Sequence, residues 1–329
     1  MTPQRPPAHD DRRAERRART RAASRSRLRR QRALVASAAI AAAAILALAL
    51  SGVMWSGASH AGNRDQSGLG AGTGTVARAG ARGTALVTKP ATDDEAHETP
   101  AVRHLIALGK PIYCAAPRGN EVALTFDDGP GQYTWLALPK LRKHHVKATF
   151  FVVGRNIALL PPALREERAL GSVGDHTFTH PLLTSLAPSE AEAQIVHTQQ
   201  AIEHVAGGPV FLFRPPYGAR DATIDRIAQR HNLLEIMWTV DSRDSLGANY
   251  AEIERNAIDG LKPGSIVLMH ENHGQTIRAM LGIFAAIQRK HLRTVSVPRL
   301  LSDDTPSDAQ VRAGGAGCGS LYRPGGNGG

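Results

Sequence analysis

Short apolar runs alternate with longer amphipathic stretches between residues 121 and 298. This alternation is typical of repeated strand and helix units around a parallel sheet. The predicted strands cover residues 121–126, 148–153, 171–175, 210–214, 234–241, 265–270 and 294–297. The predicted helices cover residues 134–145, 161–170, 189–206, 222–231, 250–260 and 276–290.

Charged and histidine side chains gather where the predicted strands end. They are Asp127, Asp128, His176, His180, Arg214, Asp241, Asp244 and His270. Parallel barrels build their active sites from the carboxyl ends of the strands, whereas residues placed for structural reasons should occur at both ends. The pattern therefore predicts an active site at this edge of the sheet.

A second pattern precedes this region. Residues 33–55 carry no charge over 23 positions and follow Arg29, Arg30 and Arg32. The run is long enough to cross a bilayer, and the arginines favour a cytoplasmic N-terminus with the remainder exported. We expect a single-pass membrane anchor; an Ala-rich buried helix, or a signal cleaved near Ser56 and Ala58 to release a secreted protein, are the alternatives.

The net charge of +11 is concentrated at the N-terminus. Residues 1–32 hold twelve arginines and three acidic residues, a net of +9, which leaves +2 for the rest of the chain. A basic groove over the folded part is therefore not supported, and we expect no nucleic-acid partner. The Arg-rich tail is expected to remain cytoplasmic.

The segments on either side of the alternating region have a different composition. Residues 56–110 are predicted to form a flexible linker rich in small and polar residues, and residues 303–329 a Gly-rich tail. The only two cysteines, Cys114 and Cys318, lie near the two ends of the structured region. In an oxidising compartment they can form an intramolecular disulfide, with two free thiols as the alternative.

The segment "DHTFTH" contains two histidines four residues apart, His176 and His180. A helical turn would place both imidazoles on one face. Since no Glu follows His176, the HExxH metalloprotease pattern is excluded. Two imidazoles with a carboxylate from a neighbouring strand end leave one position open, as in a catalytic zinc site.

The adjacent Asp127 and Asp128 follow the first predicted strand. Because successive side chains on an extended strand point to opposite faces, we expect different roles: one carboxylate binds the metal and the other accepts a proton. A helix N-cap is the structural alternative. Arg214 could hold an aspartate ionised through a bidentate contact, and Asp244 could orient His270 as a proton donor and raise its pKa.

Five motifs in order, "TFDDGP", "HTFTH", "RPPYG", "DSRDS" and "LMH", resemble the polysaccharide deacetylases with a NodB-like domain, also called carbohydrate esterase family 4. The resemblance covers residues 111–302. It implies an α/β fold, a distorted (β/α)7 barrel, here preceded by the predicted transmembrane helix and spacer. It also implies removal of acetyl groups from N-acetylglucosamine polymers or, in some members, from acetylated xylan.

The resemblance implies roles for residues of the first three motifs. Asp127 corresponds to the general base, and Arg214 to the residue that orients it. Asp128, His176 and His180 correspond to the ligands of a divalent metal. We expect Zn²⁺, although Co²⁺ or another divalent ion is compatible with these ligands.

The remaining motifs imply the rest of the site. Tyr217 would offer its backbone N–H to the oxyanion, His270 would be the general acid, and Asp244 would be the partner of His270. Leu268 would line the pocket for the acetyl methyl group.

The chain departs from the family pattern at two positions. Asp244 is followed by Ser245, where the family usually has Trp, so an aromatic wall of the acetyl pocket is missing. Trp238 is not expected to replace it, because alternation along the strand turns it away from Asp241. Asp175 precedes His176 where Asn is frequent, and is expected to hydrogen-bond a ligand histidine.

The sequence thus predicts a metal-dependent hydrolase that removes N-acetyl groups from a cell-envelope or extracellular polysaccharide, with peptidoglycan first and a chitin-like polymer second. An O-acetyl esterase acting on xylan or a similar glycan could use the same residues. A glycan-binding protein without turnover is the alternative from another class, and acetate release would separate the three.

Overall fold

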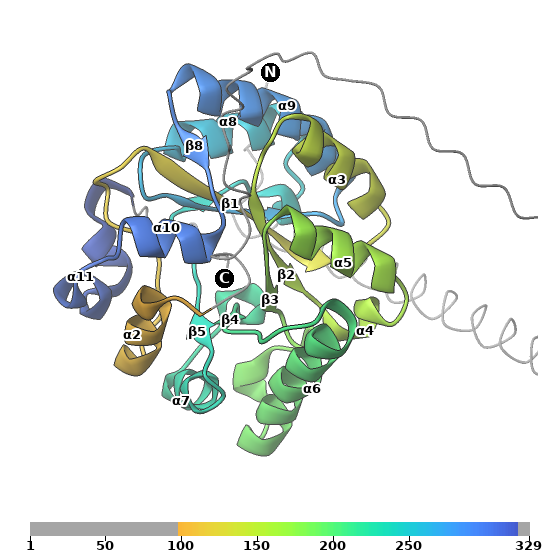
Figure 1. Ribbon diagram of the computed structural model, residues 1–329, viewed down its shortest axis with the longest axis vertical. Coiled ribbons are helices and arrows are strands. Elements are labelled where there is room, and N and C mark those ends of the chain that lie inside the picture. The colour runs from red at the N-terminus through yellow and green to blue at the C-terminus, as the bar shows by residue number, and fades with distance from the viewer. Residues whose placement is uncertain (1–97, 322–329) are drawn as a thin grey trace, which may run out of the picture. The chain divides into compact units, whose positions relative to one another are not determined.

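The computed structural model describes residues 98–321, which form a curled parallel sheet surrounded by helices (Figure 1). The predicted Arg-rich tail, the predicted membrane segment 33–55 and the linker up to residue 97 lie outside the described residues. Within 98–321, no helix has both the length and the apolar character needed to cross a bilayer.

The strands confirm the predicted α/β class. They are β1 (Glu121–Gly129), β2 (Ala148–Val152), β3 (Ser172–Asp175), β4 (Leu212–Phe213), β5 (Leu234–Glu235), β6 (Val240–Asp241), β7 (Ile266–His270) and β8 (Arg293–Thr294). The order across the sheet is β5-β4-β3-β2-β1-β7-β6, and every strand pair is parallel. All the strands therefore end at the same edge.

The helices around the sheet agree with the predicted ones to within a few residues. They are α3 (Thr134–Lys143), α5 (Pro161–Leu170), α6 (Pro188–Ala206), α7 (Ala222–Arg230), α8 (Tyr250–Gly260) and α9 (Gly274–Arg289). Neighbours pack in the order α7, α6, α5, α3, α9, α8 around the sheet (Figure 1). The short α4 (Gly154–Ile157) follows β2.

The predicted strand 234–241 is divided in the structure. Its first part, β5, pairs with β4 at one edge of the sheet, and its last part, β6, pairs with β7 at the other. Between them the Ile236 N–H donates to Phe213 O (2.8 Å) and the Thr239 N–H to Ile266 O (3.0 Å). This segment closes the barrel. Among the described strands, β8 pairs only with the start of β1. Both features distort the barrel.

Strand alternation separates two apolar layers. Leu124 and Phe126 of β1 pack outward in the cluster that includes side chains of the surrounding helices. Ala123 of β1 packs inward with Phe151 of β2 and with other side chains of the barrel interior. Thr125 and Asp127 lie on this inward side. The interior of the barrel is therefore apolar in its core and polar near the carboxyl ends of the strands.

Helix α2 (Pro100–Leu108) lies in the range predicted to be flexible linker, 56–110, and corrects that boundary. The Thr99 hydroxyl accepts a hydrogen bond from the Val102 N–H (3.2 Å) and caps the helix. Val102, Leu105 and Ile106 are buried in the interior cluster together with residues of α10 (Val297–Asp303). The single apolar stripe of α2 is covered by the barrel, so the segment is ordered.

The predicted Gly-rich tail, residues 303–329, also contains structure. It includes α11 (Asp308–Arg312) and a 3₁₀ segment, Gly314–Leu321. The Cys114–Cys318 disulfide is present, with the two Cα atoms 6.0 Å apart. It ties this segment to the start of the barrel and confirms the expected pairing.

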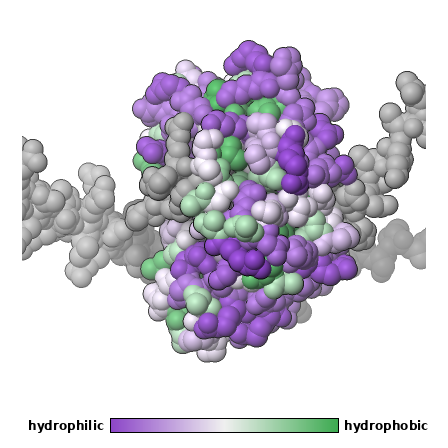
Figure 2. Space-filling model, turned by 90° about the vertical axis from the view of Figure 1, so that its left-hand side faces the viewer, coloured by the Kyte–Doolittle hydropathy of each residue, from purple (hydrophilic) through white to green (hydrophobic). Residues whose placement is uncertain are grey.

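Figure 2 shows the side of the molecule on which α2, α10 and α11 lie in Figure 1. Outside the grey atoms, hydrophilic residues cover most of this side, and hydrophobic residues occur in small separate groups. Such scattered apolar residues are ordinary for a protein surface.

Candidate active site

A β-bulge at the end of β1 brings the two adjacent carboxylates together. Asp127 is opposite Phe151 and Gly129 is opposite Val152, so Asp128 is the extra residue, with a φ of +70°. Asp127 Oδ2 lies 3.7 Å and Asp128 Oδ1 3.6 Å from His176 Nε2. The expectation of opposite faces is therefore wrong, because the bulge re-aims the second side chain.

The three predicted metal ligands converge. The ligand atoms of Asp128, His176 and His180 all lie within 4.8 Å of one another, and Asp128 Oδ1 is 3.3 Å from His180 Nε2. The segment does not turn helically as expected: Thr177 and His180 have positive φ values of +68° and +61°. The Thr177 hydroxyl accepts from the His180 N–H (3.1 Å), which fixes this turn.

The protonation states of these groups suit a divalent cation. The His176 Nδ1–H must donate to the Arg214 carbonyl (2.7 Å), since a carbonyl oxygen can only accept, so Nε2 is the ring nitrogen that faces Asp128. Burial and the neighbouring His176 lower the pKa of His180 to about 4, so its imidazole is neutral at pH 7. Burial raises the pKa of Asp128, but the surrounding imidazoles outweigh this and hold it below its usual value.

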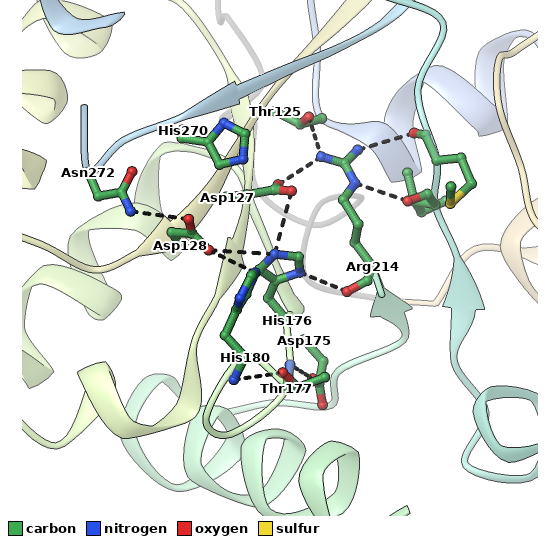
Figure 3. Close-up of polar contacts among 12 residues, drawn as sticks. Thr125, Asp127, Asp128, Asp175, His176, Thr177, His180, Arg214, His270 and Asn272 are labelled. Atoms are coloured by element: carbon green, nitrogen blue, oxygen red, sulfur yellow. Dashed lines mark hydrogen bonds and ion pairs between the residues drawn. The ribbon is translucent and has the colours of Figure 1, made fainter. Parts of the chain in front are cut away.

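Arg214 holds Asp127 from inside the barrel (Figure 3). Its Nη1 donates to Asp127 Oδ1 and to the Thr125 hydroxyl, both at 2.7 Å, and its guanidinium carbon lies 4.2 Å from the centre of the Phe151 ring. The contact with Asp127 is not bidentate as expected, because the Nε and Nη2 groups donate to the carbonyls of Ile236 and Met237. Asp127 Oδ2 is thus left facing the metal-ligand group, which consists of Asp128, His176 and His180.

His270 ends β7 directly beside Asp127, its partner in the register of the sheet. Its Nδ1 lies 2.7 Å from Asp244 Oδ1, and its N–H donates to Asp244 Oδ2 (2.7 Å). Burial lowers the pKa of His270, but Asp244 and the two aspartates of β1 raise it to about 9. The imidazole is therefore protonated at pH 7 and can donate a proton.

Asp244 is itself fixed by two further hydrogen bonds, one of them from Thr276, which the sequence did not single out. The Thr276 hydroxyl donates to its Oδ2 (2.6 Å) and the Ser245 N–H to its Oδ1 (2.9 Å). Burial raises the pKa of Asp244, but the hydrogen bonds from His270 and Thr276 outweigh this and hold the pKa below its usual value.

A cavity of about 200 Å³ opens at this edge of the barrel. It is lined by Asp127, Asp128, His176, His180, Pro215, Tyr217, Gly218, Trp238, Asp241, Ser245, Leu246, Leu268 and His270. Every predicted site residue except the buried Arg214 and Asp244 is in this lining. Tyr217 is 59% exposed and has a φ of +61°.

Two expectations about neighbouring residues are wrong. Trp238 lines the cavity, although alternation along a strand from Asp241 would turn it away. Residues 236–239 cross between β5 and β6 and are not part of a strand, so the alternation does not extend through them. The Asp175 carboxylate does not contact a ligand imidazole but accepts from the Thr177 N–H (2.7 Å), and so shapes the turn between the histidines.

Two amides that the sequence analysis missed contact Asp128. The Asn272 side chain donates to Asp128 Oδ2 (3.1 Å), and the Asn156 side chain donates to the Asp128 backbone carbonyl (3.0 Å). Asn272 follows the end of β7 by two residues, so the rule that polar residues at carboxyl ends form the site could have found it. Asn156 lies within α4, and no such signal marks it.

Comparison with known proteins supports the same family as the five motifs. Residues 115–236 match the sequence profile of the family described as polysaccharide deacetylase. The chain is 34% identical over 186 residues to a peptidoglycan-N-acetylglucosamine deacetylase of Bacillus cereus, an alignment covering 55% of this chain and 68% of the relative. The chain belongs to the polysaccharide deacetylase family. The resemblance drawn from the motifs is thereby confirmed.

Other members of the polysaccharide deacetylase family show its range. A chitooligosaccharide deacetylase of Azorhizobium caulinodans is 32% identical over 196 residues, covering 54% of this chain and 93% of the relative. The crystal structure of BA3943, described as a pseudoenzyme of carbohydrate esterase family 4 from Bacillus anthracis, aligns with a TM-score of 0.55 and 30% identity over 58% of this chain and 68% of that one. The proteins similar to this chain therefore include named deacetylases and one described as a pseudoenzyme.

Proposed function

We propose that this polysaccharide deacetylase removes N-acetyl groups from a cell-envelope N-acetylglucosamine polymer, with peptidoglycan as the first candidate. The observation that carries the proposal is the pairing of Asp127 with His270 on neighbouring strands, beside the metal-ligand group. A proton acceptor and a proton donor thus face one cavity, and amide hydrolysis requires both.

Asp128, His176 and His180 would hold a divalent metal, and zinc is proposed because two imidazoles and one carboxylate form a common catalytic zinc set. When bound, such an ion lowers the pKa of a water and polarises a carbonyl oxygen. Asp127 accepts the proton of the attacking water on Oδ2, since Arg214 occupies Oδ1. His270 then donates a proton to the departing amine, and Asp244 holds its imidazole in orientation.

The remaining residues would position the acetyl group. The backbone N–H of Tyr217 is proposed to donate to the oxyanion, and the positive φ of Tyr217 sets the direction of that turn at the cavity. Leu268 lies on the same strand as His270, two residues before it, and lines the same cavity. It is proposed to contact the acetyl methyl group, together with Trp238 in place of the aromatic residue missing at position 245.

A direct test measures acetate release by the full chain from three substrates side by side: N-acetylglucosamine oligomers, peptidoglycan and acetylxylan. We expect release from the N-acetylated polymers, loss of release after chelation, and recovery with Zn²⁺ or Co²⁺. Release from acetylxylan alone would instead identify an O-acetyl esterase. Glycan binding with no acetate release from any of them would place the chain with the non-catalytic members.

We also propose that residues 33–55 anchor the protein in the cell membrane with residues 1–32 in the cytoplasm and the catalytic domain outside. The disulfide supports export, because such bonds persist in oxidising compartments. Protease treatment of intact cells should degrade a C-terminal tag and spare an N-terminal one. Recovery of the catalytic domain in the culture medium would instead indicate cleavage.

A further inference from the structure

The two oxygens of the Asp128 carboxylate have different neighbours. Oδ1 faces the imidazoles, 3.6 Å from His176 Nε2 and 3.3 Å from His180 Nε2. Oδ2 accepts a hydrogen bond from the side-chain amide of Asn272 at 3.1 Å. Figure 3 shows Asn272 on the side of Asp128 away from the two histidines. One oxygen is therefore directed to the metal-ligand group, and the other is directed away from it.

The amide of Asn272 serves this one contact. Its Oδ1 is buried and has no hydrogen-bond partner within the described part of the chain. Turning the amide around would place that oxygen against an ionised carboxylate, so the orientation with the N–H groups toward Asp128 is the favoured one. An unsatisfied buried oxygen costs free energy, and the contact with Asp128 offsets that cost.

The backbone of Asp128 needs such support. The residue has a φ of +70° within the bulge, a conformation that is unfavourable for a non-glycine residue and persists only when neighbours impose it. Asn156 holds the carbonyl of Asp128 from α4, and Asn272 holds its carboxylate from the loop after β7. Two amides from separate elements thus fix the direction in which Oδ1 points.

We propose that Asn272 is a positioning residue that holds Asp128 as a one-oxygen metal ligand and so keeps a coordination position open for water or substrate. The proposal rests on the proposed metal-dependent function. A carboxylate that uses both oxygens would occupy two positions, whereas the hydrogen bond from Asn272 engages the second oxygen.

The test compares the full chain with its Asn272→Ala variant after chelator treatment. Zn²⁺ affinity is measured by competition with a chromophoric chelator, and we expect the variant to bind about 10- to 100-fold more weakly, the usual effect of losing such a partner. In the Co²⁺-loaded proteins, we expect the variant to absorb less strongly in the visible, because Co²⁺ absorbs less as its coordination number rises. Asn272→Leu fills the space without a hydrogen-bond donor and should show the same loss of Zn²⁺ affinity and of Co²⁺ absorption.

The matched control is Asn120→Ala. The Asn120 amide also donates a single hydrogen bond, to His291 O, but it lies just before the amino end of β1, away from the site. Its Zn²⁺ affinity should equal that of the unchanged chain. An Asn272→Ala protein with unchanged Zn²⁺ affinity, or with an unchanged Co²⁺ spectrum, would overturn the proposal.

The outcome also separates this inference from the proposed function. If the unchanged chain binds Zn²⁺ and releases acetate while Asn272→Ala binds Zn²⁺ equally well, only the role of Asn272 is wrong. If the unchanged chain binds no divalent ion, both are wrong.

Discussion

Asp127 and Asp128 have the same side chain but different surroundings. Arg214 donates to Asp127 inside the barrel, whereas two imidazoles and Asn272 surround Asp128 at the cavity. The bulge makes both environments available to neighbouring residues. Their chemical difference therefore comes from the contacts of each carboxylate and not from the strand pleat.

Replacing each aspartate by asparagine should separate the two roles. We expect Asp127→Asn to keep Zn²⁺ affinity and to lose about 10²- to 10⁴-fold in turnover, the usual contribution of general acid–base catalysis. Asp128→Asn should weaken Zn²⁺ binding itself, because it removes the ligand charge. Metal titration and acetate release on the same samples check this, with the exposed Asp259→Asn as the control. Equal metal affinities for the two variants would contradict the division of roles.

The His270–Asp244 pair predicts the alkaline side of the pH profile. A general acid must be protonated, so turnover should fall as the pH rises through the pKa of His270, about 9. Asp244→Asn removes the negative charge that raises this pKa, and the fall should therefore move to lower pH. Turnover measured from pH 6 to pH 10 for both proteins checks the shift. An unmoved alkaline limb would show that another group controls it.

At the scale of elements, α2 shows how packing orders a segment whose sequence neighbours are low in complexity. Leu105 is fully buried in the barrel interior, whereas Leu159, in the segment between α4 and α5, is 77% exposed. We expect Leu105→Ala to lower the free energy of unfolding by about 2 to 5 kcal/mol, the usual cost of a buried Leu-to-Ala change. Leu159→Ala is the matched control and should have little effect. Equal denaturant midpoints for the two variants would show that α2 does not pack on the barrel.

Helix α5 contacts the end of β7 through two buried carboxyl groups, Glu167 and Glu271. Burial raises the pKa of Glu271 to about 7, and burial together with Glu271 raises that of Glu167 well above its usual value. The Thr134 hydroxyl donates to Glu271 Oε1 (3.0 Å). Because the raised pKa values favour the protonated carboxyl groups in the folded protein, the stability that they contribute is complete below the unfolded pKa of Glu, about 4.3. It is lost as the pH rises through the folded pKa values.

Thermal unfolding from pH 5 to pH 8 tests this prediction. The free energy of unfolding should fall over this range, and Glu167→Gln should reduce the fall because one of the two carboxyl groups no longer ionises. Glu166→Gln, one residue away and partly exposed, is the control and should keep the original pH dependence. The same slope in both variants would contradict a role for the buried pair.

At the scale of the whole molecule, the disulfide joins the start of the barrel to its last described segment across a sequence separation of 204 residues. Closing a long loop restricts the unfolded chain, and removing such a bond typically costs about 2 to 5 kcal/mol. We expect Cys114→Ser/Cys318→Ser to unfold at lower denaturant concentration while the bound Zn²⁺ per chain stays the same. Identical unfolding of the unchanged protein with and without reductant would refute this contribution.

Much of the molecule could be predicted because short-range patterns set it. The period of apolar residues located the six long helices and the strands, except that the predicted strand 294–297 overlaps β8 only at Thr294. The polar residues at the carboxyl ends located the site. The linker and tail were harder: α2 has an apolar stripe but adjoins a low-complexity segment, and Gly314–Leu321 is rich in glycine. Their order comes from contact with the barrel and from the disulfide, which a local pattern does not contain.

The sequence by itself determined the α/β class, the edge of the sheet that carries the site and the residues gathered there, because alternation and strand ends are local properties of the chain. Only the tertiary structure decided how those residues face one another. The bulge at Asp128, the division of residues 234–241 between two edges and the contact of Asn272 with Asp128 all depend on elements far apart in the chain. Such contacts form only when the barrel closes, so the roles of individual atoms follow from the fold.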